Sequence, residues 1–306
     1  MDQASSLRKI VKRQAPGSIK KNAPAQKHKG DDMTSPRVIS VTSGKGGVGK
    51  TNIVASLAMA FSKLGKQVLI LDADLGLANM DIIFGMRPEF NISHVISGEK
   101  ELSEIIVDVR PGIKIIPAGS GLEDLTTLTE GQKLHLLSEF EALDGTVDFV
   151  LIDTGAGISS NVIYFNLAAD ECIIIATHEP TSITDAYAMM KVMSNNHGAK
   201  RYKLLVNMVK DANEAKTVYL TLSQAVDRFL NGAVLEYLGF IPHDEKLKTS
   251  VLNRKPVMEL YPDAPSSRQI ADKAKLILNT PLAKGSEGNV KFFMKRFMAY
   301  SQALNG

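Results

Sequence analysis

The stretch Gly44-Lys45-Gly46-Gly47-Val48-Gly49-Lys50-Thr51 constrains this 306-residue chain more than any other part of its sequence. It matches the phosphate-binding pattern G-x-x-x-x-G-K-[ST] at every fixed position. The β-branched residues 37–42 before it predict a buried strand, and residues 52–61 after it have the spacing of a helix. The glycines let backbone N–H groups turn inward, and the helix start adds partial positive charge. The sequence therefore predicts a polyphosphate site, in which Lys50 neutralises phosphate oxygens and Thr51 ligates Mg²⁺.

A second lysine, Lys45, lies inside this loop, directly before two glycines. The pattern Lys-Gly-Gly-x-Gly-Lys-Thr resembles the deviant Walker A motif of the MinD/ParA ATPases. In that family the extra lysine reaches across a dimer interface to the other subunit's phosphates. The resemblance implies that Lys45 is catalytic and couples dimerisation to ATP hydrolysis, as an arginine finger does; a surface lysine beside the loop is the alternative. Asn52 stands where many relatives have a second threonine, which leaves one α-phosphate contact open.

Three aspartates follow apolar runs that predict strands. Residues 67–71 lead into Asp72 and Asp74, and residues 149–152 lead into Asp153. Ligands of parallel sheets bind at the carboxyl ends of the strands, so we expect Asp72 and Asp153 to hold Mg²⁺ through water. Resemblance to the family's switch segment implies that Asp74 is catalytic and orients the attacking water. A turn or helix-capping carboxylate is the alternative for Asp72 and Asp74.

Three more positions are assigned to the nucleotide through the same resemblance. Asn207 ends a predicted strand, residues 203–207, and its amide can pair with the edge of adenine, as in relatives. Pro242 is expected to pack against the other side of the base. A glutamate at the position of Glu179 touches the opposite subunit's ribose in the family; a surface glutamate that starts a helix is the alternative. The chain has no Asn-Lys-x-Asp guanine motif, which favours ATP over GTP.

Residues 1–35 are rich in lysine, arginine, proline and glycine, which predicts a flexible basic arm. A solvated tail without a role is the alternative. The first residues match Asp-Gln-Ala-x-x-Leu-Arg, which resembles the activator motif of the FlhG/FleN regulators of flagellar number, a branch of the MinD-type ATPases. In that branch the motif stimulates a signal-recognition-type GTPase, FlhF. The resemblance implies a partner-binding segment, in which Gln3 completes the partner's site, made of Asp2, Gln3, Ala4, Leu7 and Arg8.

The last stretch of the chain, from residue 290, has the spacing of a basic amphipathic helix. Lys291, Lys295 and Arg296 are expected on its polar face. We expect the apolar face to enter an anionic membrane surface reversibly, through Val290, Phe293, Met294, Phe297 and Tyr300. Packing of this helix on its own domain is the alternative, and both hold if the helix is hidden in the monomer and released in an ATP-bound dimer.

The alternation of strands and helices from Val38 onward predicts an α/β fold, a doubly wound, mostly parallel sheet of the P-loop NTPase type. We expect three parts: the arm 1–35, an ATPase domain 36–282, and a linker with the amphipathic helix 283–306. Residues 242–265 are expected to be mostly loop, and 268–279 a closing helix. Two further helices are expected, 129–143 with Leu134, Leu137, Phe140 and Leu143 buried, and 211–231 with Val218, Leu222, Val226 and Phe229 buried.

Composition bounds the class of protein only loosely. The net charge of +3 does not force a nucleic-acid partner. The single cysteine, Cys172, lies in an apolar run, which is typical of a core residue in a cytosolic protein. No apolar run approaches 18 residues, so no membrane-spanning helix is expected.

Together these features predict a slow, Mg²⁺-dependent ATP hydrolase that cycles between a cytoplasmic monomer and an ATP-bound homodimer at the inner face of the cell membrane. The resemblance implies control of the number and placement of bacterial flagella. Its implied partners are FlhF and either basal-body or C-ring components or a flagellar transcription regulator; nucleic acid is not expected. The alternatives are a division-site-selecting MinD, and a ParA-like DNA-segregation ATPase, whose DNA affinity should fall steeply with salt.

Overall fold

The computed structural model describes residues 36–74, 79–117, 128–282 and 290–302. The predictions for the N-terminal arm, including Gln3 and its neighbours, lie outside the described residues. The strands are β1 (Arg37–Ser43), β2 (Val68–Ala73), β3 (Val107–Arg110), β4 (Ile113–Pro117), β5 (Phe149–Ala156), β6 (Glu171–Ala176), β7 (Arg201–Val209) and β8 (Val234–Pro242). The helices are α2 (Lys50–Lys63), α3 (Met80–Phe84), α4 (Ile92–Ile96), α5 (Leu102–Ile105), α6 (Glu130–Glu141), α7 (Ser160–Ala168), α8 (Pro180–His197), α9 (Ala212–Phe229), α10 (Glu245–Leu252), α11 (Val257–Leu260), α12 (Pro265–Asn279) and α13 (Val290–Gln302).

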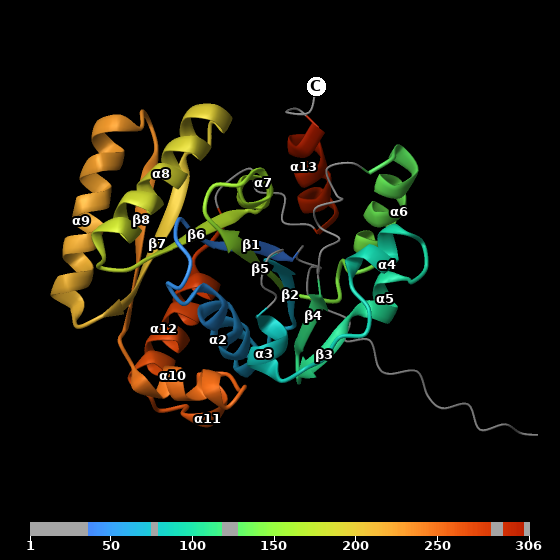
Figure 1. The fold of residues 1–306 in the computed structure, drawn as a ribbon, viewed down its shortest axis with the longest axis horizontal. Helices are drawn as coiled ribbons and strands as arrows, with labels where there is room; N and C mark the ends of the chain where they lie inside the picture. Colours follow the sequence, from blue (N-terminus) through green and yellow to red (C-terminus); the bar gives the residue numbers. More distant parts are fainter. Residues whose placement is uncertain (1–35, 75–78, 118–127, 283–289, 303–306) are drawn as a thin grey trace, which may run out of the picture. The chain divides into compact units, whose positions relative to one another are not determined.

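The eight strands form one sheet in the order β3-β4-β2-β5-β1-β6-β7-β8 (Figure 1). All neighbours are parallel except β3 and β4, which are antiparallel. The central strands are buried along nearly their whole length because helices cover both faces of a parallel sheet. The predicted doubly wound α/β fold is therefore confirmed.

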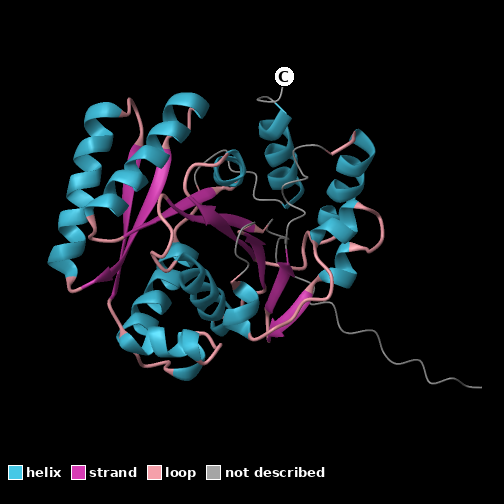
Figure 2. Cartoon of the chain, in the orientation of Figure 1, coloured by secondary structure: helices cyan, strands magenta, loops and turns pink. Residues whose placement is uncertain are grey.

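Helices pack on both faces of the sheet (Figure 2). On one face, α2, α3, α11 and α12 share a core in which the Phe61 ring of α2 stacks on Phe149 of β5, with centroids 4.1 Å apart. On the other face, α8 and α9 cover the side of the sheet that carries β6, β7 and β8. Helices α4, α5, α6 and α13 cover the side that carries β2 and β4, and α7 lies between the two groups. The strands β1, β2 and β5, whose carboxyl ends are described below, are thus packed between helices on both faces.

Several local predictions were wrong. Leu134 is 68% exposed, because α6 turns Leu136 and Phe140, one helical turn apart, toward α4 and α13. Phe229 is 59% exposed at the end of α9, and the next residue, Leu230, enters the core instead. The segment 242–265, expected to be loop, contains α10 and α11. The closing helix begins earlier than expected, at Pro265, because proline suits the first turn of a helix.

Cys172 is buried, as predicted, and burial raises the pKa of its thiol to about 12. This thiol therefore stays protonated near neutral pH and acts as a small apolar side chain. In the part of the chain that the structure describes, no helix is both long enough and apolar enough to cross a membrane.

Candidate nucleotide site

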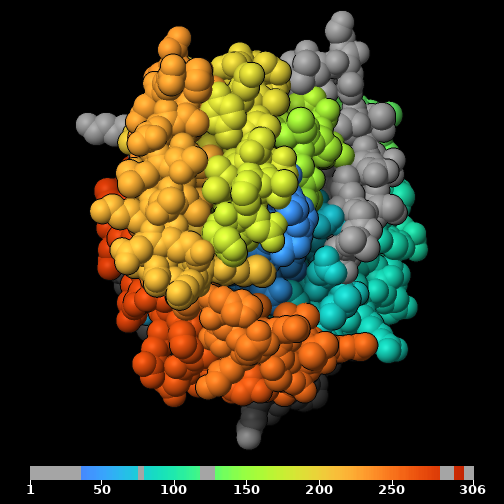
Figure 3. All heavy atoms as spheres, turned by 60° about the vertical axis from the view of Figure 1, so that its left-hand side comes forward, coloured from blue at the N-terminus to red at the C-terminus, as the bar shows by residue number. Residues whose placement is uncertain are grey.

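The phosphate loop joins the end of β1 to the start of α2, with Gly49 as the N-cap and Lys50 as the first helical residue. A Cβ at Gly44 would lie 2.3 Å from the backbone carbon of Asp185 in α8, so only glycine fits there. Gly49 has φ +86°, and a Cβ would lie 2.6 Å from the Asn207 amide nitrogen. The loop is thus wedged between α8 and the end of β7. In Figure 3 the blue segment that carries it reaches the surface between the yellow-green start of α8 and the orange and cyan segments.

The two lysines of the loop lie in different environments. Lys50 is buried, and its ammonium lies 3.1 Å from Asp153 Oδ1 and 4.0 Å from Asp74 Oδ2. Asp153 also accepts a hydrogen bond from Thr51. The structure therefore brings together Lys50, Thr51, Asp74 and Asp153, four residues that the sequence assigned to one phosphate and metal site.

Asp72 and Asp153 are direct neighbours in register at the ends of β2 and β5. Burial, and next the charge of Asp153, raise the pKa of Asp72 to about 7. Burial also raises the pKa of Asp153, whose Oδ2 atom has no hydrogen-bond partner among the described residues. Lys50 is the buried cation beside Asp74 and Asp153, and Asp72 is the neighbour of Asp153. One positive charge thus faces three carboxylates, so the cluster has an excess of negative charge when these are ionised. These residues therefore fit a divalent cation, which prefers carboxylate oxygens.

The raised pKa of Asp72 predicts a pH dependence of stability without Mg²⁺ or nucleotide. Between about pH 4 and pH 7, folded Asp72 retains a proton that the unfolded chain, with the ordinary pKa of 3.8, has lost. The free energy of unfolding should therefore fall as the pH rises through this range, by up to about 4 kcal/mol. Asp153 contributes in the same direction, and Lys50 and Asp74 are the other charges that face the pair.

Urea unfolding in EDTA at pH 5 and pH 7.5 measures this dependence. Asp72→Asn should flatten it and stabilise the protein at the higher pH. An equally steep pH dependence in Asp72→Asn would show that other groups carry it.

The Lys45 side chain reaches the start of α8. Its ammonium donates to Glu179 Oε2 at 2.7 Å and to Thr181 Oγ1 at 3.0 Å, and its side chain is 39% exposed. This bond lowers the pKa of the Glu179 carboxyl. Glu179 is the N-cap residue of α8, yet its side chain makes no capping bond. Both residues assigned to a neighbouring subunit's nucleotide are thus side by side at the surface of one subunit.

Asn207 is buried at the end of β7, and its Nδ2 atom donates to the carbonyl oxygen of Val48 at 2.7 Å. It therefore holds the phosphate loop, a role that the sequence did not reveal. Pro242 ends β8, the neighbour of β7 at the sheet edge. The assignment of Asn207 and Pro242 to the adenine stays a prediction, as does the assignment of Asn52, which is half-buried in the first turn of α2.

Sequence reasoning missed a buried polar cluster directly behind the loop. The Thr42 hydroxyl accepts from the Thr154 hydroxyl at 2.9 Å and from the Asn166 side-chain amide at 3.2 Å. Thr42 lies two residues before Gly44, and Thr154 follows Asp153. The available signal was weak: two hydroxyl residues at strand ends and one asparagine inside an otherwise apolar helix.

Helix α13 packs on the domain in this structure. Phe293 and Phe297 are fully buried, and the Phe165 ring of α7 stacks on both, with centroids 6.1 and 4.3 Å apart. Arg296, expected on the polar face, instead pairs with the buried Asp170 at 3.0 Å. Met294 is buried as well, whereas the side chains of Val290 and Tyr300 lie outside the described part. The apolar face predicted for a membrane thus contacts α6 and α7 in this structure.

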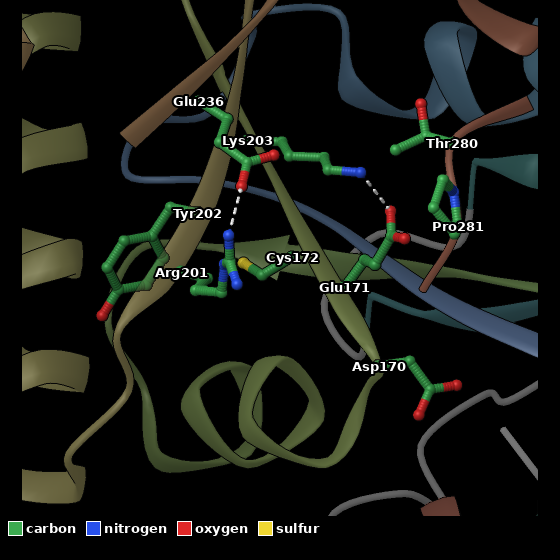
Figure 4. A pocket seen from close by; sticks show the side chains of 9 residues that line it. All are labelled: Asp170, Glu171, Cys172, Arg201, Tyr202, Lys203, Glu236, Thr280 and Pro281. Atoms are coloured by element: carbon green, nitrogen blue, oxygen red, sulfur yellow. Dashed lines mark hydrogen bonds and ion pairs between the residues drawn. The ribbon is translucent and has the colours of Figure 1, made fainter. Parts of the chain in front are cut away.

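A hollow of about 180 Å³ lies at the other end of the strands, where β6, β7 and β8 begin (Figure 4). Its charged side chains are paired: Lys203 with Glu171 at 2.8 Å, Arg201 with Glu236 at 3.3 Å, and Asp170 with Arg296 of α13 at 3.0 Å. Glu171 also pairs with Arg37 of β1. Because these charges are compensated, we assign this hollow no ligand. The candidate nucleotide site is the one at the carboxyl ends of the strands.

Comparison with known proteins places the chain among ATPases. Residues 36–206 match the family model described as an AAA domain. The chain is 38% identical over 268 residues to the antiactivator FleN of Pseudomonas aeruginosa, covering 88% of this chain and 95% of FleN. It is 37% identical over 273 residues to the flagellum site-determining protein YlxH of Helicobacter pylori, covering 88% and 92%. The MinC:MinD cell division complex of Aquifex aeolicus contains a similar fold, with a TM-score of 0.64 at 29% identity, covering 81% of this chain and 98% of that one.

A two-lysine phosphate loop between a central parallel strand and a helix, with carboxylates at the ends of neighbouring strands, defines an ATP-hydrolysing P-loop ATPase of the MinD/ParA type. The chain belongs to this family and, within it, to the FleN/FlhG-type ATPases that regulate flagellar number. The prediction of this family from the loop and the first residues is thereby confirmed.

Proposed function

We propose that two copies of this chain bind Mg²⁺·ATP face to face and that Lys45 of each copy completes the site of the other. The observation that carries this proposal is the difference between the two lysines. Lys50 is buried beside Asp153, whereas Lys45 is half-exposed and held at the start of α8. A cation that arrives only on dimerisation makes hydrolysis depend on the dimer, as an arginine finger does.

Within each site, Lys50 neutralises the β- and γ-phosphate oxygens, and the backbone N–H groups of the loop and of the α2 start bind the phosphates. Asp74, 4.0 Å from the Lys50 ammonium, orients the attacking water. Thr51, with Asp72 and Asp153 through water, would hold Mg²⁺, which supplies further neutralisation of the phosphate charge. Asn207 and Pro242 contact the adenine, and Glu179 contacts the partner's ribose.

The cycle that follows controls the number and placement of flagella. The monomer is cytoplasmic with α13 docked on α6 and α7, and the ATP-bound dimer releases α13 to the inner face of the cell membrane. Doubling the anchors strengthens membrane binding through avidity. The N-terminal segment with Gln3 stimulates the GTPase FlhF, and a basal-body component or a flagellar transcription regulator receives the signal. The similar protein FleN of Pseudomonas aeruginosa is named an antiactivator, which supports a transcription regulator as partner.

Asp74→Ala tests this cycle. Without the residue that orients water, the variant should bind ATP, remain dimeric and stay on anionic vesicles, because hydrolysis no longer separates the subunits. Light scattering after size exclusion measures the dimer, and vesicle co-sedimentation measures the membrane fraction. Wild type with ADP is the control and should be monomeric and unbound. A monomeric Asp74→Ala variant in ATP would contradict the proposal.

A further inference from the structure

The buried polar cluster of Thr42, Thr154 and Asn166 connects three elements that meet behind the nucleotide site. Thr42 and Thr154 are fully buried, and Asn166 is 5% exposed. Thr42 is the last residue but one of β1, Thr154 lies near the end of β5, and Asn166 lies in α7. Each threonine is next to a part of the site: Thr42 leads into the phosphate loop, and Thr154 follows Asp153, which holds Lys50.

The same helix, α7, also forms part of the surface on which α13 packs. Phe165, the residue before Asn166, stacks on Phe293 and Phe297, and Tyr164 contacts Phe297 edge-on. Successive residues of α7 thus point to opposite partners, one toward the C-terminal helix and the other toward the end of β1. A displacement of α7 when α13 leaves is transmitted to the phosphate loop through the Asn166–Thr42 bond, because a 3.2 Å hydrogen bond does not survive a shift of about 1 Å.

We propose that Asn166 is a positioning residue that couples the docking of α13 to the arrangement of the phosphate loop. This inference rests on the proposed function in that α13 undocks in the ATP-bound state. It adds that ATP binding already weakens the docking of α13 within one subunit, before two subunits meet. By linkage, undocking of α13 must then strengthen ATP binding by the same factor. Asn166 transmits this effect, since its amide is the one described side-chain link from α7 to Thr42.

The link is also open to substitution without loss of the fold. Among the described residues, the Asn166 Oδ1 atom has no hydrogen-bond partner, so its amide is only partly satisfied. Asn166→Leu removes both polar ends at similar volume and leaves Thr42 its bond from Thr154. Such a replacement of an incompletely paired buried group costs little stability.

The test is a double-mutant cycle on nucleotide affinity. The dissociation constant of a fluorescent, nonhydrolysable ATP analogue with Mg²⁺ is measured at protein concentrations that keep the chain monomeric. Phe297→Ser releases α13, because it places a hydroxyl in the stack with Phe165. In the wild-type background this release should tighten analogue binding about fivefold or more. In the Asn166→Leu background it should change binding less than twofold.

Ile163→Val is the matched control, because Ile163 is equally buried in α7 but belongs to the core shared with α8 and α9. This control should keep the full effect of Phe297→Ser. Equal tightening in the wild-type and Asn166→Leu backgrounds would overturn the inference, and so would the absence of tightening in the wild-type background.

These failures are distinguishable from failure of the proposed function. That function fails if ATP does not dimerise the Asp74→Ala variant, whatever Asn166 does. The inference fails alone if the dimer and vesicle binding are normal while Asn166→Leu leaves the coupling intact. Circular dichroism of each variant confirms that the monomers compared are folded.

Discussion

Replacing Lys45 with alanine is expected to lower kcat for ATP hydrolysis about 10³-fold. This is the lower end of the range seen when a cation that a second subunit supplies is removed. Binding of ADP to the monomer should change less than about twofold, because Lys45 lies with Glu179 and Thr181 rather than beside Lys50. Steady-state hydrolysis and equilibrium binding measure the two quantities. Lys50→Ala is the contrasting variant, since it removes the buried lysine and should abolish nucleotide binding itself.

Mixing two inactive variants shows which subunit supplies the lysine. In a heterodimer of Lys45→Ala and Asp74→Ala, the site of the first subunit keeps Asp74 and receives Lys45 from the second. One complete site forms, so the mixture should regain a substantial share of wild-type activity. If Lys45 acted within its own subunit, both sites would be incomplete and the mixture would stay inactive. An inactive mixture with proven heterodimers would therefore refute the transfer of Lys45 across the interface.

The fold could be predicted because its signals are local. Strands β2 and β5 begin as apolar runs that reach an aspartate, and β1 mixes β-branched with small polar residues before the glycine loop. These patterns are recognisable without knowing which helices cover the sheet. The exposed Leu134 and Phe229 show where such reasoning stops. Which side of a helix is buried depends on its neighbours: α6 meets α4 and α13, which lie far away in sequence. Helix α10 was missed because its signal is an Asp244 N-cap in a polar segment without a continuous apolar stripe.

Which residues of the candidate site lie together could be predicted as far as motifs reach, whereas their roles stay predictions. The loop, Asp72, Asp74 and Asp153 meet as the order of strands requires. The contacts of Lys45 with Glu179, of Asn207 with Val48, and of Asn166 with Thr42 join residues 134, 159 and 124 positions apart. No sequence spacing encodes such pairs, because they depend on how closely α7, α8 and β7 approach the loop. Gly44 and Gly49 permit this approach, since a Cβ at either position would collide with Asp185 or Asn207. The sequence alone does not show these close contacts.

Phe165→Ala is expected to bring the protein to membranes without ATP. Phe165 is 1% exposed and stacks on two rings of α13, so its loss should weaken the dock by about 3–5 kcal/mol. That change raises the undocked fraction at least about a hundredfold. The residues of α13 remain unchanged, so the face proposed to bind the membrane is intact. Co-sedimentation with anionic vesicles in ADP measures the effect, with wild type in the supernatant as reference.

Phe165→Leu is the control, because it keeps most of the apolar contact and should bind vesicles only weakly. Asp170→Asn weakens a different contact of α13, since it removes the ion pair with Arg296, and should shift vesicle binding in the same direction. Hydrogen exchange of the α13 amides reports undocking without vesicles. The α13 amides of Phe165→Ala could exchange freely while the protein does not bind anionic vesicles. In that case the apolar face of α13 only packs on its own domain, and the proposal that this helix binds the membrane is wrong.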